Sequence, residues 1–407
     1  MPGSGILWQN EAKTVVLLDL PRSIEEAQCL SDKQPLSQEA TNVTAPSRRL
    51  ISSPAPQHPF LTPEPKSSDY AQSATSPSSQ IAELMTIASV ESALHEIGTS
   101  YQGPWCLPRI TSKPKQPNDQ HGILEHEEDE HSKSSSKTTR LKRPSKPSTP
   151  SYHLPPKSHP LTGPFSPPPN HQKFNLILLD PPWPNRSAKR KRSGHGTYTP
   201  LNSLSSTSQL LCSFPISSLL SDENGGGLVA VWVTNSSKFQ HLLLDPKKGI
   251  FAKNWGVELV GEWILLKVTS QGEPIVDLGS KWRKPYERLL IARKRGVAEA
   301  GTGAVKTKVI VSVPDIHSRK PNLKRLFEEE EGLLPTGYTA MEMFARNLTA
   351  GWWAWGNEVT KFQEEQYWVE EGEEVVSEVT ALEELTEEGV DSAAVPRGCV
   401  QEDHTAK

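Results

Sequence analysis

The chain has 407 residues, a formal net charge of −4 and a hydrophobic content of 35%. That content is below the roughly 45–50% usual for globular domains, and the prolines gather in stretches rich in serine and lysine, so part of the chain is expected to be disordered. No apolar run approaches the roughly 20 residues of a membrane span, and the four cysteines are widely spaced without a paired-ligand pattern. Composition therefore excludes an integral membrane protein, a disulfide-rich secreted domain and a zinc site. We expect a soluble intracellular protein without a metal centre.

Residues 1–106 are expected to form a small N-terminal module of strand and helix. The apolar stretch 14–20 predicts a strand. Ser23 and Glu26 have the spacing of a capping box, which predicts a helix that begins there and runs through Leu30.

Two segments rich in polar residues interrupt this part of the chain. Residues 31–79 lack a sustained hydrophobic period and predict a disordered loop, and residues 107–150 predict a disordered linker. Between them, apolar residues recur at helical spacing from Ile81 to Ile97, which predicts an amphipathic helix that packs against another part of the protein. The basic cluster 140–143 in the linker is either a nuclear localisation signal or part of a solvated linker.

The most informative stretch is Leu176–Trp183, in which four apolar residues are followed by Asp-Pro-Pro-Trp. The apolar run predicts a buried strand, and because proline cannot continue a central strand, the chain must leave the sheet at Asp180. Asp180 is therefore expected at the carboxyl end of a strand, where open α/β sheets keep their ligand crevices.

These residue types suit the methylation of an amine on a flat base. An adenine amino group is a poor nucleophile, and the Asp180 carboxylate and the Pro181 carbonyl can accept hydrogen bonds from both of its N–H bonds. Pro181 and Pro182 fix φ near about −65°, so the carbonyl is aimed before the substrate arrives. Trp183 offers a face on which the base can stack, an interaction worth roughly 1–3 kcal/mol. The alternative is a strand that ends in a proline-rich turn with an incidental aspartate.

A basic loop directly follows this motif. It begins at Asn185 and contains five positive charges, Arg186, Lys189, Arg190, Lys191 and Arg192. These charges can neutralise phosphates that flank a target base. A nuclear import signal and a plain solvated loop have the same composition, but the position beside Trp183 favours a role in substrate binding.

Strand and helix signals alternate through residues 151–368, which is typical of α/β folds and predicts one catalytic domain. Strands are expected at 176–179, 228–233, 257–268, 289–293, 308–313, 339–344 and 352–355, and helices at 206–213, 236–244 and 321–331. Residues 369–407 predict an acidic disordered tail. Because residues 358–407 hold fifteen acidic and three basic residues, the preceding part of the chain carries a charge of +8, which fits a polyanionic partner.

The chain resembles the eukaryotic mRNA-adenosine-methyltransferase-like family, whose members use S-adenosylmethionine, and within it a fungal form of the methyltransferase-like protein 4 branch. The resemblance covers about residues 150–368. Beside Asp180–Trp183 it rests on the blocks Trp232–Asn235, Gly261–Trp263, Lys284–Glu287, Ile310–Pro314, His317–Pro321, Met343–Leu348 and Trp355–Glu358. It implies a Rossmann-like methyltransferase sheet flanked by helices, with a donor-binding strand that follows the catalytic strand in sequence.

The resemblance also implies site residues. Donor contacts are expected at Asp180, Lys320, Phe344, Arg346, Asn347, Asn357 and Glu358. For Lys320 the resemblance implies a contact with either the donor's carboxylate or a substrate phosphate. Substrate contacts are expected at Tyr198, Thr234, Asn235, Glu262 and Trp263, beside the basic loop. A helix cap is the alternative for Thr234 and Asn235, and core packing is the alternative for Glu262 and Trp263. Wider relatives place an acidic residue against the donor's adenine, and the stretch 161–165 has none, so no residue is assigned to that half of the donor site.

These features predict an S-adenosylmethionine-dependent adenine N6-methyltransferase that acts on RNA by direct methyl transfer without a metal. By resemblance the target is adenosine or 2′-O-methyladenosine in small nuclear RNA, and the protein is expected to work as a monomer in the nucleus. DNA adenine methylation by the same residues stays open, because recognition of a 2′-hydroxyl depends on geometry. A non-catalytic nucleic-acid-binding subunit is the alternative of another class, although such relatives lose the aspartate or the tryptophan that stand here at Asp180 and Trp183.

Overall fold

The computed structural model describes residues 4–34, 48–61, 77–111, 151–184, 203–223, 225–280, 283–296, 305–316 and 319–370. The predicted basic loop 185–192, Tyr198, the basic cluster 140–143 and the acidic tail beyond residue 370 lie outside these ranges.

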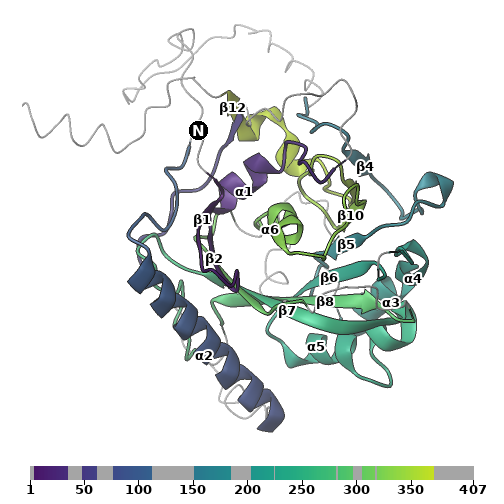
Figure 1. Ribbon diagram of the computed structural model, residues 1–407, viewed down its shortest axis with the longest axis horizontal. Coiled ribbons are helices and arrows are strands. Elements are labelled where there is room, and N and C mark those ends of the chain that lie inside the picture. Colours follow the sequence, from purple (N-terminus) through teal and green to yellow (C-terminus); the bar gives the residue numbers. More distant parts are fainter. Residues whose placement is uncertain are drawn as a thin grey trace, which may run out of the picture.

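One mixed sheet of ten strands runs through the described part of the chain (Figure 1). Across the sheet the strands lie in the order β1 (Ile6–Gln9), β2 (Val15–Leu18), β9 (Lys308–Ser312), β7 (Val257–Lys267), β8 (Tyr286–Lys294), β6 (Leu228–Val233), β5 (Leu176–Leu179), β10 (Ala340–Met343), β11 (Trp353–Trp355) and β4 (His159–Leu161). β1 is antiparallel to β2, and β8 is antiparallel to β7 and β6, while the other neighbours are parallel. A second, two-stranded sheet pairs β3 (Arg48–Leu50) with β12 (Trp368–Glu370).

The strand order changes direction between β5 and β10. The chain continues from β5 into β6 on one side and from β10 into β11 on the other, and β5 and β10 lie parallel and adjacent. In open α/β sheets a crevice forms outside the carboxyl ends of the strands at such a switch point. All four residues of β5 are buried, as expected for a parallel strand covered on both faces. The predicted α/β fold class and the strand ahead of Asp180 are confirmed.

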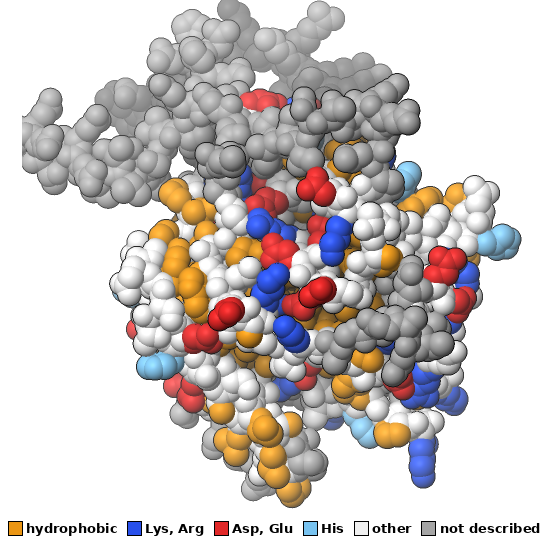
Figure 2. Space-filling model, viewed as in Figure 1, with side chains coloured by type: hydrophobic (Ala, Val, Ile, Leu, Met, Phe, Trp, Pro, Cys, Tyr) orange, Lys and Arg blue, Asp and Glu red, His pale blue; other side chains and the backbone are white. Residues whose placement is uncertain are grey.

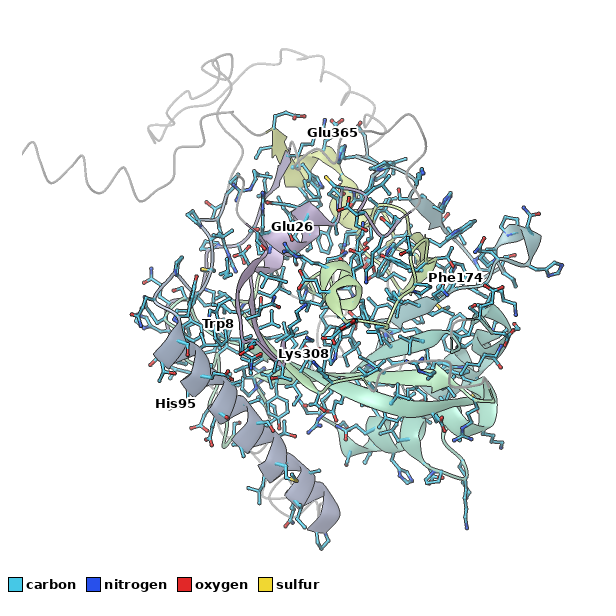
Figure 3. All side chains as sticks on the ribbon, in the orientation of Figure 1. Trp8, Glu26, His95, Phe174, Lys308 and Glu365 are labelled. Atoms are coloured by element: carbon cyan, nitrogen blue, oxygen red, sulfur yellow. The ribbon has the colours of Figure 1, made fainter. Side chains whose placement is uncertain are left out.

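One face of the sheet, here called the front face, is covered by helix α6 (Lys324–Glu329). The Trp263 ring of β7 packs under this helix with its centroid 4.6 Å from that of Phe327. Lys308, labelled in Figure 3, lies beside them, and its Nζ is 2.6 Å from the Glu330 carboxylate.

The opposite, back face is covered by a longer series of helices. They are α2 (Pro77–Ser100), α3 (Leu204–Ser213), α4 (Ile216–Leu219), α5 (Ser237–Leu244) and the π-helical turn η4 (Phe251–Trp255). The last four cover β5 and β6, whereas α2 covers β7 and β9 with its buried residues Val90, Ala93 and Ile97. Trp8 of β1, labelled in Figure 3, packs against the same cluster as α2. Within the described ranges no helix is long and apolar enough to cross a bilayer.

Helix α2 confirms the helix predicted between Ile81 and Ile97, but its apolar residues do not share one face. Ile81, Leu84 and Met85 are 59–67% exposed, and Figure 2 shows hydrophobic side chains gathered over that end of the helix. Only the C-terminal half of α2 therefore packs as an amphipathic helix does.

Most other predicted elements are confirmed within a few residues, but the start of α1 (Leu20–Glu26) is not where the capping box placed it. Asp19, rather than Ser23, is the N-cap, and its Oδ1 accepts a hydrogen bond from the Arg22 N–H at 2.9 Å. The Ser23 hydroxyl donates to the Leu20 carbonyl instead. The prediction of a helix from Ser23 through Leu30 was wrong, because a carboxylate one turn earlier satisfies the first free N–H groups.

Asp19 is expected to stabilise the N-terminal part of the fold. The residue is 2% exposed, and beside Arg22 its carboxylate accepts a hydrogen bond from the Leu107 N–H at 2.8 Å. Asp19→Ala removes both acceptors, so we expect a loss of about 2–4 kcal/mol in the free energy of unfolding, measured by urea denaturation. Asp19→Asn keeps an acceptor and should lose less.

The exposed Asp32 provides the matched control for this change. Asp32→Ala should alter the free energy of unfolding by less than about 0.5 kcal/mol. An Asp19→Ala protein as stable as the unmodified one would contradict the assignment.

Candidate active site

Asp180 lies at the switch point between β5 and β10. Its backbone N–H donates to the Met343 carbonyl of β10 at 3.3 Å. The Trp183 N–H donates to the Pro181 carbonyl at 2.8 Å, which closes the turn. A carbonyl oxygen has two lone pairs, so the Pro181 carbonyl can accept an amine N–H in addition to this bond.

The Trp183 indole is held from two sides. Its Nε1 donates to the Trp232 carbonyl of β6 at 2.7 Å, and its ring lies against Phe239 of α5 with centroids 4.9 Å apart. Phe239 was missed by the sequence analysis, since no spacing links residue 239 to residue 183. The indole is thereby oriented before any base arrives.

A chain of charges connects Asp180 to two other strands. The Lys320 Nζ lies 3.7 Å from Asp180 and 2.6 Å from Glu287 of β8, and Lys267 of β7 also pairs with Glu287. The same Nζ lies 5.3 Å from the centre of the Trp232 ring, within the range of a cation–π contact. Lys320 and Asp180 both line a cleft at the switch point. Glu287 was not assigned a role by the sequence analysis, although it ends one of the blocks that carried the resemblance.

The electrostatics of this cluster are set by burial and by the two lysines. Burial raises the pKa of Asp180, and Lys320 partly opposes that rise. Burial alone would also raise the pKa of Glu287, but Lys320 and Lys267 hold it well below its usual range. Burial lowers the pKa of Lys320, but Asp180 and Glu287 outweigh it, so the net pKa is raised and the ammonium keeps its charge.

Glu342 of β10 is a second carboxyl group in the same cleft. Burial, followed by the charge of Asp180, raises the pKa of Glu342 to about 8. Among the described residues no hydrogen bond or ion pair involves its side chain. Near neutral pH this group therefore holds a proton while Glu287 does not.

The backbone after β10 turns sharply into the cleft. Phe344 has φ of 63°, a left-handed conformation uncommon for a residue other than glycine, and its ring packs against Phe214 and Trp355. Such outliers often mark functional sites. Beyond it, the Arg346 Nε lies 3.5 Å from the Glu358 carboxylate.

The cleft brings together most of the residues expected to bind a methyl donor. Its lining consists of Leu178, Asp180, Trp232, Arg319, Lys320, Pro321, Asn322, Leu323, Glu342, Phe344, Arg346, Asn347 and Phe362. This set fits S-adenosylmethionine, because Lys320, Arg346 and Asn347 can donate to a carboxylate, while carboxyl groups can accept from an ammonium or from ribose hydroxyls. Asn357 is exposed beside Glu358, next to the cleft-lining residues rather than among them.

Two of the expected substrate contacts lie elsewhere. Trp263 is fully buried on the front face under α6, where its Nε1 donates to the Lys306 carbonyl at 3.1 Å. Glu262 points to the back face and pairs with Arg288. Core packing, the alternative for Trp263, is the role the structure gives it, and neither side chain lines the cleft.

Thr234 and Asn235 are half-buried at the end of β6. The Asn235 side-chain amide donates to the Tyr286 carbonyl, so it joins β6 to the start of β8. Ser236 is the N-cap residue of α5, so neither Thr234 nor Asn235 caps that helix.

Residues 174–358 match the model of the MT-A70 family. The chain is 43% identical to "N6-methyladenosine RNA methyltransferase MTA1" of Pyricularia oryzae over 89% of this chain and 96% of that protein. It is 42% identical to the protein of the same name in Cryphonectria parasitica, over 90% of this chain and 94% of that protein. "N(6)-adenine-specific methyltransferase METTL4" of Homo sapiens is 36% identical over 54% of this chain and 45% of that protein.

The raised pKa of Glu342 predicts a pH-dependent loss of stability. In the unfolded chain this carboxyl group loses its proton near about pH 4.3, whereas the folded protein keeps it until about pH 8. The free energy of unfolding therefore falls as pH rises between these values. Glu342→Gln, which is always neutral, should raise the melting temperature by roughly 5 °C more at about pH 9 than at about pH 5.

Differential scanning calorimetry at the two pH values checks this expectation. The exposed Glu331 supplies the control, because Glu331→Gln should shift the melting temperature equally at both. A Glu342→Gln shift that is the same at both pH values would show that Glu342 is ionised in the folded protein.

Proposed function

The chain belongs to the MT-A70 family, and from this membership and the geometry at Asp180 we propose that it methylates the N6 amine of adenine in RNA. The methyl donor of the family is S-adenosylmethionine, which supplies an electrophilic methyl group when it is bound. The observation that carries the proposal is the turn that begins at Asp180. The aspartate pairs with Lys320 at the switch point, and three residues later the Trp183 indole is held by Trp232 and Phe239.

Each residue of the turn has a distinct task in the proposed reaction. The Asp180 carboxylate accepts one N–H of the adenine amine, and the Pro181 carbonyl accepts the other with its second lone pair. Both bonds draw electron density toward the amine nitrogen and fix its lone pair toward the donor. The proton on that nitrogen becomes acidic as the new bond forms, so no strong base is required. Trp183 holds the base by stacking.

Donor binding is assigned to the cleft beside this turn. Lys320, Arg346 and Asn347 are proposed to hold the donor's carboxylate end, and Phe344 and Glu358 to contact its ribose side, with Asn357 next to them. The left-handed Phe344 turns the backbone toward this position, and the Arg346–Glu358 pair orients both side chains.

We prefer RNA to DNA as the substrate, because the sequence similarity to proteins named as RNA methyltransferases covers more of this chain. The two fungal proteins named as RNA methyltransferases match about nine-tenths of this chain. A Caenorhabditis elegans protein named "DNA N6-methyl methyltransferase" is 34% identical over 43% of it. The similarity to METTL4 covers about half of the chain. The narrower expectation from that branch is a target in small nuclear RNA, and the experiment below includes an oligonucleotide that tests it.

We also propose that the protein acts as a monomer in the nucleus. One chain supplies the Asp180 turn, Lys320 and Glu287, and its own N-terminal strand β2 extends the sheet beside β9. The basic cluster 140–143 in the sequence is the feature that supports nuclear import.

Methyl transfer itself provides the direct test. The purified protein is incubated with labelled S-adenosylmethionine and matched RNA and DNA oligonucleotides, including one with 2′-O-methyladenosine, and the nucleosides are identified by mass spectrometry. We expect N6-methyladenosine from RNA. Asp180→Asn should lower kcat by roughly a hundredfold or more, because the charge that polarises the amine is lost.

Asp32→Asn is the matched control, since that residue is exposed and lies in the N-terminal segment. Full activity of Asp180→Asn would refute the mechanism. Product formed only from DNA would move the substrate assignment to the alternative.

The pH profile tests the part that Lys320 has in the site. Asp180 must be ionised to accept the amine N–H, so activity should fall as pH drops through its raised pKa. Lys320→Gln removes the cation that lowers this pKa, and the acid limb of kcat should therefore move to higher pH. An acid limb that stays in place would show that Lys320 does not act on Asp180.

A further inference from the structure

Helix α2 lies on the back face of the sheet, where it covers β7 and β9. Its residues Val90 and Ala93 share a buried cluster with Tyr286, the first residue of β8. Glu287, which holds Lys320, is the next residue of that strand. The helix therefore contacts the part of β8 from which the charge cluster is built.

Strand β8 presents neighbouring residues to opposite faces. Successive side chains of a strand alternate, so Glu287 points to the front and Arg288 to the back. The Arg288 guanidinium pairs with Glu262 of β7 and donates to the Thr86 hydroxyl of α2. Its side chain is 12% exposed, so this contact is largely shielded from water. Helix α2 thus holds the residue directly after Glu287.

A second link lies on the other side of Glu287 in the chain. Lys284, whose side chain is 9% exposed, pairs with the Glu83 carboxylate of α2 and also donates to the Leu278 carbonyl at 3.3 Å. Glu83 and Thr86 lie three residues apart, which places them on the same side of the helix. The two links bracket Glu287 at positions 284 and 288.

We propose that α2 positions the catalytic end of β8, with Glu83 and Thr86 acting through Glu287 and Lys320 on Asp180. If the start of β8 moves, Glu287 no longer holds Lys320 at 2.6 Å, and Lys320 leaves its place 3.7 Å from Asp180. Glu83 and Thr86 are positioning residues, since neither lines the cleft. That this positioning affects catalysis rests on the proposed function.

The link predicts a change in the charge state of the site, which a purely structural helix would not cause. The charged groups that act on Asp180 come from four parts of the fold: Lys320, Glu287 of β8, Lys267 of β7, and Arg346 just after β10. Glu342 of β10 also faces this cluster, and the charge of Asp180 raises its pKa. Lys320 exerts the largest of the effects that lower the pKa of Asp180. Its displacement therefore raises that pKa, and the acid limb of the pH profile follows it upward.

Hydrogen exchange tests the positioning without reference to activity. In the full-length protein Glu83→Lys places two like charges together, and we expect the backbone N–H groups of Lys284 and of Tyr286–Arg288 to exchange roughly tenfold faster. The double variant Glu83→Lys with Lys284→Glu restores the pair in reverse and should recover the original rate. Glu91→Lys makes the same charge change on an exposed part of α2 and should leave this segment unaffected.

Methylation assays on the same proteins test the consequence. Glu83→Lys, and separately Thr86→Val, should lower kcat roughly ten- to a hundredfold with little change in the KM for RNA, and should move the acid limb upward by about one unit. The double variant should regain both the rate and the profile, and Glu91→Lys should retain both.

The outcomes separate the two proposals. Unchanged exchange in Glu83→Lys, or no recovery in the double variant, overturns the positioning role. Faster exchange with an unchanged kcat and pH profile also overturns it, because the helix would then stabilise β8 without acting on Asp180. If the unmodified protein transfers no methyl group, the proposed function fails, while the exchange measurement still decides whether α2 holds β8.

Discussion

The site depends on the ion pairs that hold the half-buried carboxylate of Asp180 at the carboxyl end of β5. Partial removal of a charge from water is unfavourable, and the loss of one partner from such a pair leaves the charge of the other uncompensated. Here Lys320 neutralises both Asp180 and Glu287, and Lys267 supplies a second positive charge to Glu287. The ionised Asp180 therefore depends on contacts between four segments: the end of β5, the segment that holds Lys320, β8 and β7.

Lys320 also connects this charge cluster to the aromatic part of the site. The Lys320 ammonium lies over the Trp232 ring, and the backbone carbonyl of Trp232 accepts a hydrogen bond from the Trp183 indole N–H. Phe239 then supports the indole from α5. One strand, β6, thus positions both the cation that acts on Asp180 and the ring proposed to hold the base, so the two halves of the site are fixed relative to one another.

The sequence predicted well those elements whose pattern is local. Four buried residues and two prolines determine where β5 ends, so Asp180 could be placed without knowledge of any neighbour. Glu262 and Trp263 were harder, because a β-bulge between Leu259 and Gly261 changes the register of β7 and decides which face each side chain takes. Phe239 and Glu287 could not be assigned because their partners are remote in the chain.

The N-terminal segment and the strands of the family-matched region share one core. β2 pairs with β9, and Val15 and Leu17 pack in the cluster that also contains Ile264, Leu266 and Val311. Without residues 4–34 and 77–111, β9 would have a free edge and this apolar face would meet water, an arrangement prone to aggregation. The family match begins at residue 174, yet the chemistry it describes stands on a sheet that residues before it complete. Because α2 packs in this shared core, its contacts with β8 can affect the Asp180 carboxylate on the opposite face of the sheet.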